Sequence, residues 1–119
     1  MKRSLNKSGS IEVICGCMFS GKTEELIRRI RRAKIAKMSV IVFKPKIDSR
    51  YSNTEIVSHN KIKIDSYCVQ SSKEIINYSS NFEVLGIDEV QFFDNDILKV
   101  CKKLASLGKR IIIAGLDKD

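Results

Sequence analysis

The sequence predicts an α/β fold in which a mostly parallel sheet carries helices on both of its faces. Short apolar runs, several of them rich in Val and Ile, alternate with longer amphipathic segments at helical spacing. These runs lack the polar alternation of a half-exposed strand, which is typical of strands buried on both sides. Because buried strands that alternate with helices are joined by crossover connections, we expect the sheet to be mostly parallel.

The chain has 119 residues, enough for one domain with a buried core. No stretch approaches the ~20 continuous apolar residues of a membrane span, and the basic N-terminus lacks the apolar segment of a signal peptide. We therefore expect a cytoplasmic protein without a membrane partner. The net charge of +8 could indicate nucleic-acid binding, but aromatic residues do not interleave with the basic ones. A solvated basic surface with a phosphate site is favoured, and no nucleic-acid partner is expected.

The N-terminal half is expected to contain a flexible leader, two strands and a helix. Residues 1–10 are polar and basic and are predicted as the leader, so that the domain would span residues 11–119. The run "IEVIC" predicts a strand that enters a glycine loop, and "SVIVFK" predicts a second one closed by Pro45. A helix is expected from Thr23 onward, and its buried face is predicted to hold Leu26, Ile27, Ile30 and Ala33.

The C-terminal half continues this alternation after a polar segment, "IDSRYSNTEIVSHNKIKIDSYCV", that could form a hairpin or a strand followed by loops. "SSKEIINYSS" predicts a short helix with a serine N-cap and a glutamate in its first turn. "FEVLGIDEV" and "RIIIAGLD" predict two buried strands. Between them we expect an amphipathic helix that ends at Gly108 and has one apolar side, formed by Ile97, Leu98, Cys101, Leu104 and Ala105.

The four cysteines do not form the paired C-x-x-C units of a structural zinc site. We expect reduced, mostly buried thiols at Cys15, Cys17, Cys68 and Cys101.

The stretch "GCMFSGKT" matches the phosphate-binding loop pattern G-x-x-x-x-G-K-[ST] and lies between a predicted strand and a predicted helix. Gly16 and Gly21 allow the backbone amides to approach phosphate oxygens, and the start of the helix adds to that attraction. Lys22 would neutralise the β- and γ-phosphates, while the hydroxyl of Thr23 would bind Mg²⁺. Phosphate contacts are predicted for the whole loop: Gly16, Cys17, Met18, Phe19, Ser20, Gly21, Lys22 and Thr23.

A second acidic motif follows the predicted strand in "VLGIDEVQFF". Asp88 ends the apolar run, where such an aspartate usually holds Mg²⁺ through water. Glu89 comes one residue later, so its side chain points elsewhere and can act as a general base. Together the two motifs predict a P-loop NTPase fold but leave ATPases, helicases and small-molecule kinases open; GTPases are less favoured because no N-K-x-D motif is present.

The residues "GCMFSGKTEELIRRIRRAKIA", "IDSRYS", "GIDEVQFF" and "GLDKD", in this order, resemble the cellular-type (type II) thymidine kinases. The resemblance implies a RecA-like P-loop kinase that transfers the γ-phosphate of ATP, with Mg²⁺, to the 5′-hydroxyl of thymidine for DNA synthesis. It also implies a homotetramer that is inhibited by dTTP.

The resemblance assigns roles to single residues. Glu89 would be the catalytic base and Asp88 would lie at the Mg²⁺, with Asp48 supporting the metal side. Arg50 would lie near the phosphates. Val90 and Gln91 belong to the acidic motif, which extends the predicted ATP-binding set, and the residues that match the thymine pocket are Met18, Phe92 and Leu116.

In the family, the segment after "GLDKD" completes the thymidine pocket and is followed by a zinc-binding domain and a lasso-like loop. The 119 residues contain neither. We therefore expect no zinc site, and we expect this chain to bind Mg-nucleotide while turning over thymidine weakly or not at all. The alternatives are a non-catalytic nucleotide-binding remnant and another P-loop ATPase, such as a helicase core.

Overall fold

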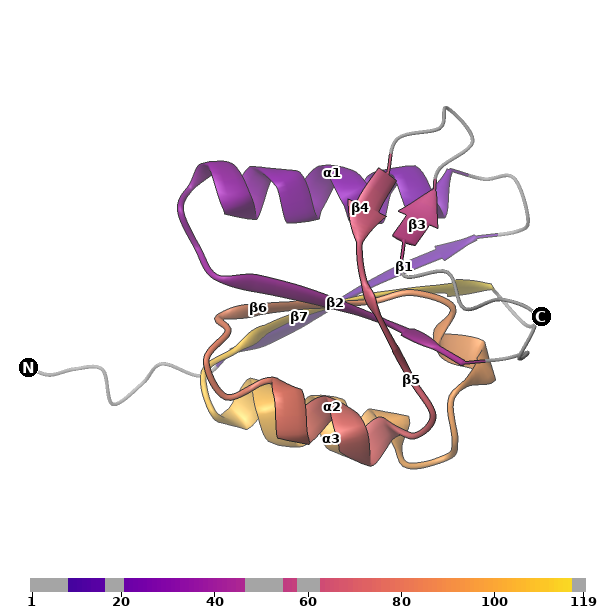
Figure 1. Cartoon of the computed structure of the whole chain (residues 1–119). Coiled ribbons are helices and arrows are strands. Elements are labelled where there is room, and N and C mark those ends of the chain that lie inside the picture. Colours follow the sequence, from indigo (N-terminus) through magenta and orange to yellow (C-terminus); the bar gives the residue numbers. More distant parts are fainter. Residues whose placement is uncertain (1–8, 17–20, 47–54, 58–62, 117–119) are drawn as a thin grey trace, which may run out of the picture.

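The computed structural model describes residues 9–16, 21–46, 55–57 and 63–116. These residues form three helices, seven strands and one 3₁₀ turn (Figure 1). In chain order the elements are β1 (Ser10–Gly16), α1 (Lys22–Ile35), β2 (Val40–Pro45), β3 (Glu55–Val57), β4 (Lys63–Asp65), β5 (Tyr67–Val69), α2 (Ser72–Tyr78), β6 (Val84–Ile87), the 3₁₀ turn η2 (Val90–Phe92), α3 (Ile97–Ser106) and β7 (Arg110–Leu116).

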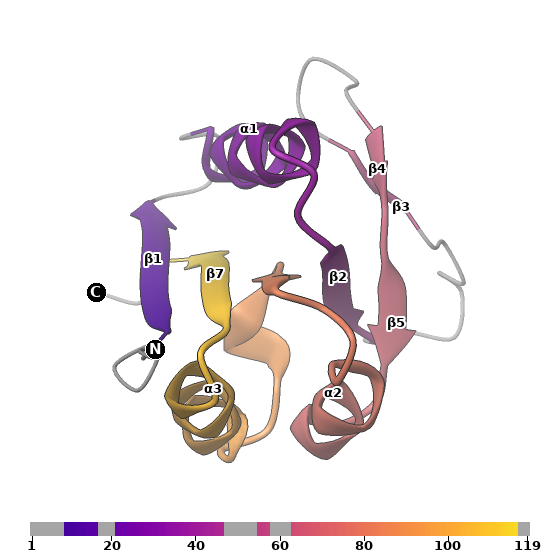
Figure 2. The same ribbon diagram turned by 90° about the vertical axis from the view of Figure 1, so that its left-hand side faces the viewer.

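Five of the strands form one sheet in the order β1-β7-β6-β2-β5, and every pair in it is parallel. Helix α1 covers one face of this sheet, whereas α2 and α3 cover the other (Figure 2). This confirms the predicted α/β fold with helices on both faces. Strand β7 lies between β1, which leads into the glycine loop, and β6, which leads into the acidic motif.

Each face of the sheet has its own apolar core. The stripe predicted on α1 is buried, since Leu26, Ile27, Ile30 and Ala33 all have relative exposures of 2% or less. They pack against side chains of the sheet that include Val84 and Ile112. The opposite core joins α2 and α3 to the sheet around Phe43, Ile75, Leu85, Ile87, Leu104 and Ile111.

Strand β1 begins at Ser10, inside the segment predicted as leader. Gly9, the residue before it, is already bound to the rest of the domain. The amide of Gly9 donates a hydrogen bond to the carbonyl of Ala105 at 2.7 Å. A Cβ at position 9 would lie 1.8 Å from the carbonyl oxygen of Lys109, so only glycine fits here. Residues 1–8 lie outside the described part of the chain.

Helix α3 corrects one prediction about its buried face. Ile97, Val100, Cys101 and Leu104 are buried, whereas Leu98 is 60% exposed. The buried residues repeat at intervals of three and four, and Leu98 lies about 100° around the helix from Ile97. The predicted end of the helix is confirmed, because Gly108 has a left-handed φ of 93°.

The polar segment before α2 contains both a hairpin and a strand of the main sheet. Strands β3 and β4 pair antiparallel with Ile56 opposite Ile64, which confirms the hairpin alternative. Strand β5 pairs parallel with β2 and forms the sheet edge, which was not predicted. The helix that follows is capped as expected, because the carboxylate of Glu74 accepts hydrogen bonds from the amides of Gln70 and Ser71.

Among the described cysteines, the prediction of mostly buried thiols is wrong for Cys15. It is exposed because β1 is an edge strand of the sheet. Cys68 is half-buried, and burial raises the pKa of the Cys101 thiol to about 11. Cys17 lies outside the described residues. Within the described residues, no helix is both long and apolar enough to cross a membrane.

Candidate active site

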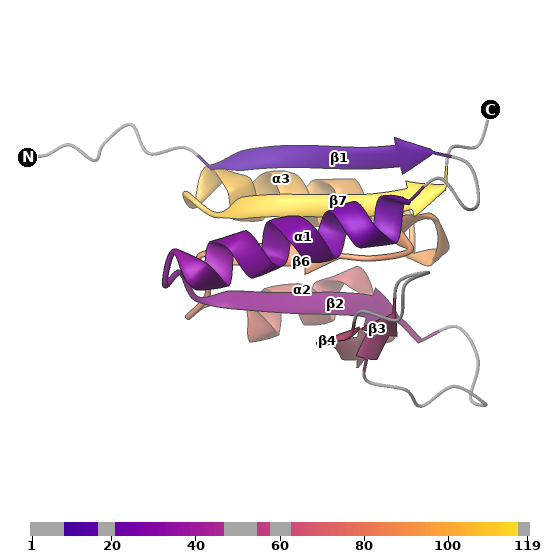
Figure 3. The same cartoon turned by 90° about the horizontal axis from the view of Figure 1, so that it is seen from above.

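The carboxyl ends of the parallel strands bring the two sequence motifs to the same edge of the sheet. Strand β1 ends at Gly16 and β7 at Leu116, and the two run in one direction (Figure 3). Strand β6, which ends at Ile87, is parallel to β7. Gly16 is in register with Leu116. In open α/β sheets, ligands bind at this edge, in the loops that follow the strands.

The described ends of the glycine loop have the backbone geometry of a phosphate site. Gly21 adopts a left-handed conformation with a φ of 85° and caps α1, whose first residues are Lys22 and Thr23. The amides in the first turn of a helix have no partner within the helix, and they point toward any group bound there. The carbonyl of Gly21 already accepts from the amide of Glu25 at 3.0 Å. Cys17, Met18, Phe19 and Ser20 lie outside the described residues.

An ion-pair network connects the strand before the loop to the helix after it. The carboxylate of Glu12 on β1 lies 2.9 Å from Arg29 on α1 and 2.6 Å from Arg110 on β7. The hydrogen bond from Arg110 is the main cause that lowers the pKa of Glu12, and Arg29 adds to it. Arg29 also binds Glu25 at 2.7 Å. These groups are partly exposed, so the ion pairs contribute little to stability. They connect β1 to both α1 and β7.

Asp88 is a buried carboxyl group immediately after β6. It is 6% exposed, and its amide donates to the carbonyl of Phe43 at 2.9 Å. Burial, followed by the neighbouring charge of Glu89, raises the pKa of Asp88 to about 6, while the positive charges of Lys22 and Lys44 act in the opposite direction. The structure therefore places the loop lysine within electrostatic range of the acidic motif. A buried carboxylate that is incompletely compensated is typical of a site that binds a cation or substrate.

Glu89 turns the chain out of the sheet through an unusual backbone conformation. It has a φ of 53° and a ψ of 45°, in the left-handed region that a side chain other than glycine rarely adopts. Its amide donates to the carboxylate of Asp88 at 2.9 Å, and its own carboxylate accepts from Gln91 at 3.4 Å. Such conformations cluster at functional sites.

The far end of the acidic turn is held by Asp94. Its carboxylate accepts hydrogen bonds from the amide of Ser72 at 2.9 Å, from the hydroxyl of Ser72 at 2.6 Å and from the amide of Asp96 at 3.0 Å. Ser72 is fully buried at the start of α2. Asp94 therefore connects the acidic turn to α2, on the face of the sheet opposite α1.

Replacing Asp94 by Ala is expected to lower the free energy of unfolding by about 1 kcal/mol, because it leaves the buried groups of Ser72 without their acceptor. Ser72→Ala keeps the backbone bond and is expected to lose less. The Ser72 hydrogen bonds lower the pKa of Asp94 below its ordinary value of 3.8. The stabilisation by Asp94 is therefore present above that value and is lost as the pH falls through the lowered pKa. Urea denaturation near neutral pH and in acid measures both effects; equal stability of wild type and Asp94→Ala at neutral pH would contradict the prediction.

The sequence interpretation missed Lys44, the penultimate residue of strand β2, whose other residues are mostly buried. Lys44 is half-buried on β2, and its charge acts on Asp88. The signal was present, because a lysine inside the apolar run "VIVFKP" is unusual for a strand buried on both faces. The positive charges of Lys22 on α1 and Lys44 on β2 thus both act on the carboxyl group of Asp88.

The residues predicted for the thymine pocket are only partly described. Phe92 ends η2 and is 53% exposed, so it belongs to the surface of this edge rather than to the core. Leu116 ends β7 beside Gly16, although its side chain is not described. Met18, Asp48 and Arg50 lie outside the described residues.

The oxygen donors present suit Mg²⁺. Within the part of the chain that the structure describes, no group of three His, Cys, Asp or Glu side chains could hold a metal ion. Mg²⁺ does not require such a cluster, because it usually takes one or two protein carboxylates and fills its other positions with water and substrate phosphates. The buried carboxylate of Asp88 and the hydroxyl of Thr23 are donors of this hard, oxygen-containing kind.

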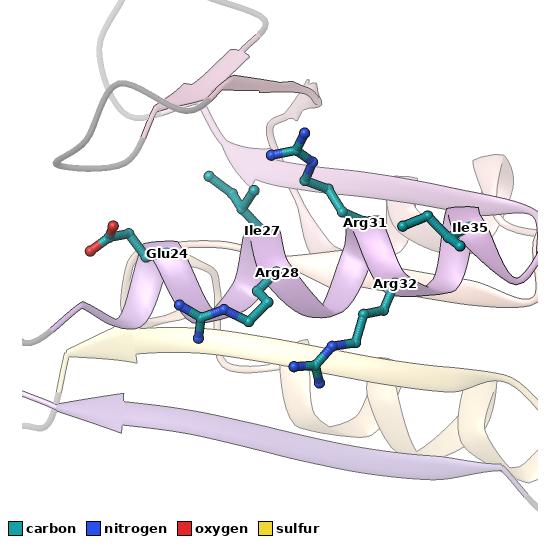
Figure 4. A pocket seen from close by; sticks show the side chains of 6 residues that line it. All are labelled: Glu24, Ile27, Arg28, Arg31, Arg32 and Ile35. Carbon is teal, nitrogen blue, oxygen red and sulfur yellow. The ribbon is translucent and has the colours of Figure 1, made fainter.

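A hollow of about 270 Å³ lies elsewhere, along α1. All of its lining side chains come from this helix (Figure 4): Glu24, Ile27, Arg28, Arg31, Arg32 and Ile35. Arg28 is engaged with Glu25 in an ion pair. The hollow contains neither Lys22 nor the acidic pair, so it is separate from the candidate active site.

Comparison with known proteins decides between the classes of P-loop enzyme that the two motifs left open. The family model for thymidine kinase matches residues 9–119. The chain belongs to the thymidine kinase family. This confirms the resemblance and does not support the helicase alternative.

Among curated proteins, the chain is similar to the thymidine kinase of Porphyromonas gingivalis. The two are 58% identical over 113 residues, which cover 95% of this chain and 55% of that protein. The chain thus spans about half the length of this thymidine kinase, and the shared half contains both the glycine loop and the acidic motif.

Proposed function

We propose that this chain carries the ATP-binding and phosphoryl-transfer part of a thymidine kinase, which moves the γ-phosphate of ATP to the 5′-hydroxyl of thymidine. The observation that carries the proposal is the acidic pair at the end of β6, where buried Asp88 experiences the positive charge of Lys22 from the glycine loop. Because the chain belongs to the thymidine kinase family, thymidine is the proposed acceptor of the phosphoryl group.

The phosphates of ATP would lie at the carboxyl edge of the sheet. The amides of residues 16–23 and the start of α1 would surround them, and Lys22 would neutralise the β- and γ-phosphates. Arg50, Val90 and Gln91 complete the proposed ATP-binding set. Because phosphoryl transfer demands little covalent chemistry from the protein, placing and neutralising the γ-phosphate is the main task of these residues.

Thr23 and Asp88 would hold a Mg²⁺ ion, Asp88 partly through water, with Asp48 supporting that side. When bound, the ion supplies charge neutralisation across the β- and γ-phosphates. Asp88 suits this role because burial and the neighbouring Glu89 leave its charge incompletely compensated.

Glu89 would act as the general base that accepts the proton of the 5′-hydroxyl. Glu89 is half-buried, follows Asp88 directly and accepts a hydrogen bond from Gln91, so the proposed base would lie next to the proposed metal side. Met18, Phe92 and Leu116 are proposed to contact the thymine ring. Phe92 is partly exposed, so its ring is accessible to a ligand.

The remaining proposals follow from the family. They are a homo-oligomeric assembly, a tetramer in type II enzymes, inhibition by dTTP, a role in DNA synthesis and a cytoplasmic location.

Mg-ATP binding by calorimetry and ADP release with and without thymidine test the proposal on the 119-residue chain. We expect saturable Mg-ATP binding and a weak ADP release that depends on thymidine. The alternative that the sequence left open is a nucleotide-binding module without turnover. Binding without thymidine-dependent release would favour that module; no binding at all would contradict both.

A further inference from the structure

Gly115 lies on β7 directly under the turn that carries Glu89. A Cβ added at Gly115 would come within 2.6 Å of Cγ1 of Val90, 2.7 Å of the side-chain oxygen of Gln91 and 3.4 Å of the backbone nitrogen of Val90. Because carbon atoms that are not bonded do not approach closer than about 3.5 Å without repulsion, an alanine here would displace the turn or its side chains. Gly115 opens the stretch "GLDKD", but none of the roles proposed above is assigned to it.

The two displaced side chains differ in how easily they can move. Gln91 is long, so its amide group can rotate away. Val90 is β-branched and short, with few allowed rotamers, and its Cγ1 is tied closely to the backbone. Val90 also packs against the core formed by α2 and α3. The contact with Val90 is therefore relieved mainly by moving the backbone of η2.

A movement of η2 is transmitted to Glu89, because Glu89 is the residue that turns the chain into it. The left-handed conformation of Glu89 is held by the neighbours on each side. On one side of the turn, Asp88 is held by the hydrogen bond from its amide to the carbonyl of Phe43 on β2. On the other side, Asp94 is held by the hydrogen bonds that it accepts from Ser72. Gly115 is the third support, beneath the middle of the turn.

We propose that Gly115 is a positioning residue for the proposed base Glu89: the absence of a side chain lets η2 lie against β7 and so sets the direction of the Glu89 carboxylate. The inference rests on the proposed function for its consequence in phosphoryl transfer. Its structural part, the contact that fixes η2, does not depend on that function. A glycine inside a buried strand marks a place where another part of the chain approaches closely.

The proposal is tested with Gly115→Ala, Val90→Ala and the double variant, measured on the 119-residue chain. The first readout is the set of backbone NMR chemical shifts of Glu89, Val90 and Gln91, which requires no activity. We expect Gly115→Ala to change these shifts and the double variant to restore them toward those of Val90→Ala, because Val90→Ala removes the Cγ1 atom. The second readout is kinetic: Gly115→Ala is expected to lower kcat by about tenfold or more, with a smaller change in the KM for ATP, because small misplacements of reacting groups are costly.

Gly86→Ala is the matched control, since Gly86 is also a glycine inside a buried parallel strand. An added Cβ there would meet the side chains of Ile30 at 3.0 Å and Leu26 at 3.4 Å on α1, on the opposite face of the sheet. It is expected to alter stability while leaving the shifts of η2 and the kinetics unchanged. Unchanged η2 shifts in Gly115→Ala, or no recovery in the double variant, would overturn the proposal. A wild-type chain without thymidine turnover would count against the proposed function, while the shifts still decide the role of Gly115.

Discussion

Glu89→Gln is expected to lower the kcat of thymidine phosphorylation by about 10²–10⁴, the usual contribution of a positioned general base. Gln has nearly the same shape as Glu, so it can keep the left-handed backbone and the contact with Gln91. It cannot accept the proton of the 5′-hydroxyl. The phosphate site around Lys22 is untouched, and the affinity for Mg-ATP is expected to stay within about threefold of wild type, because the lost group interacts with the acceptor rather than with the donor.

The measurement is single-turnover phosphoryl transfer together with calorimetric binding of Mg-ATP. Glu83→Gln provides a matched control, because Glu83 immediately precedes β6, at the opposite end of the strand from Glu89. Glu83 accepts hydrogen bonds from the amide and hydroxyl of Ser39, which Gln can also accept. A Glu89→Gln variant with the kcat of the control would rule out Glu89 as the base.

The motifs of this chain could be interpreted from sequence because each is a local pattern with one structural meaning. "GCMFSGKT" between a strand and a helix requires a left-handed glycine before the helix, and Gly21 has that conformation. "VLGIDEV" places an acidic residue at the end of an apolar run, and Asp88 ends up buried at the sheet edge. Parallel strands then bring both motifs together without further information.

Features that depend on distant contacts could not be derived in the same way. The exposure of Leu98 follows from which side of α3 meets the sheet, and both neighbouring apolar residues fit a helical pattern locally. The three-residue strand β5 owes its place to its pairing with β2. Glu89 has a left-handed backbone at the start of η2, which packs against β7, and no propensity of glutamate indicates this.

Asp88→Asn is expected to raise the free energy of unfolding near pH 8 by about 1–3 kcal/mol, although it removes a residue proposed to hold Mg²⁺. Burial and the charge of Glu89 raise the pKa of Asp88 from 3.8 to about 6. Each unit of pKa shift corresponds to about 1.4 kcal/mol, and the unsatisfied amide hydrogens of a buried Asn offset part of the gain. The same substitution is expected to weaken Mg-ATP binding, so stability and function change in opposite directions at one residue.

The pH dependence has a definite sign. Well below pH 3.8, the ordinary pKa of this carboxyl, Asp88 is protonated in both the folded and the unfolded chain, so wild type and Asp88→Asn should differ little. As the pH rises toward 6, the unfolded carboxyl loses its proton while the folded one retains it, and the stability contributed by the raised pKa is progressively lost. The advantage of the variant therefore grows between about pH 4 and 6 and then remains constant.

Urea denaturation of both proteins across this pH range measures the effect, with Asp65→Asn as the control because Asp65 is an exposed aspartate. The control is expected to show no comparable gain. A constant difference between Asp88→Asn and wild type at every pH would mean that packing, rather than an uncompensated charge, sets the stability at this position. A gain that disappears when Mg-ATP is added to wild type would instead indicate that the bound ligand supplies the compensation that the free protein lacks, because a ligand that binds only the folded state stabilises it.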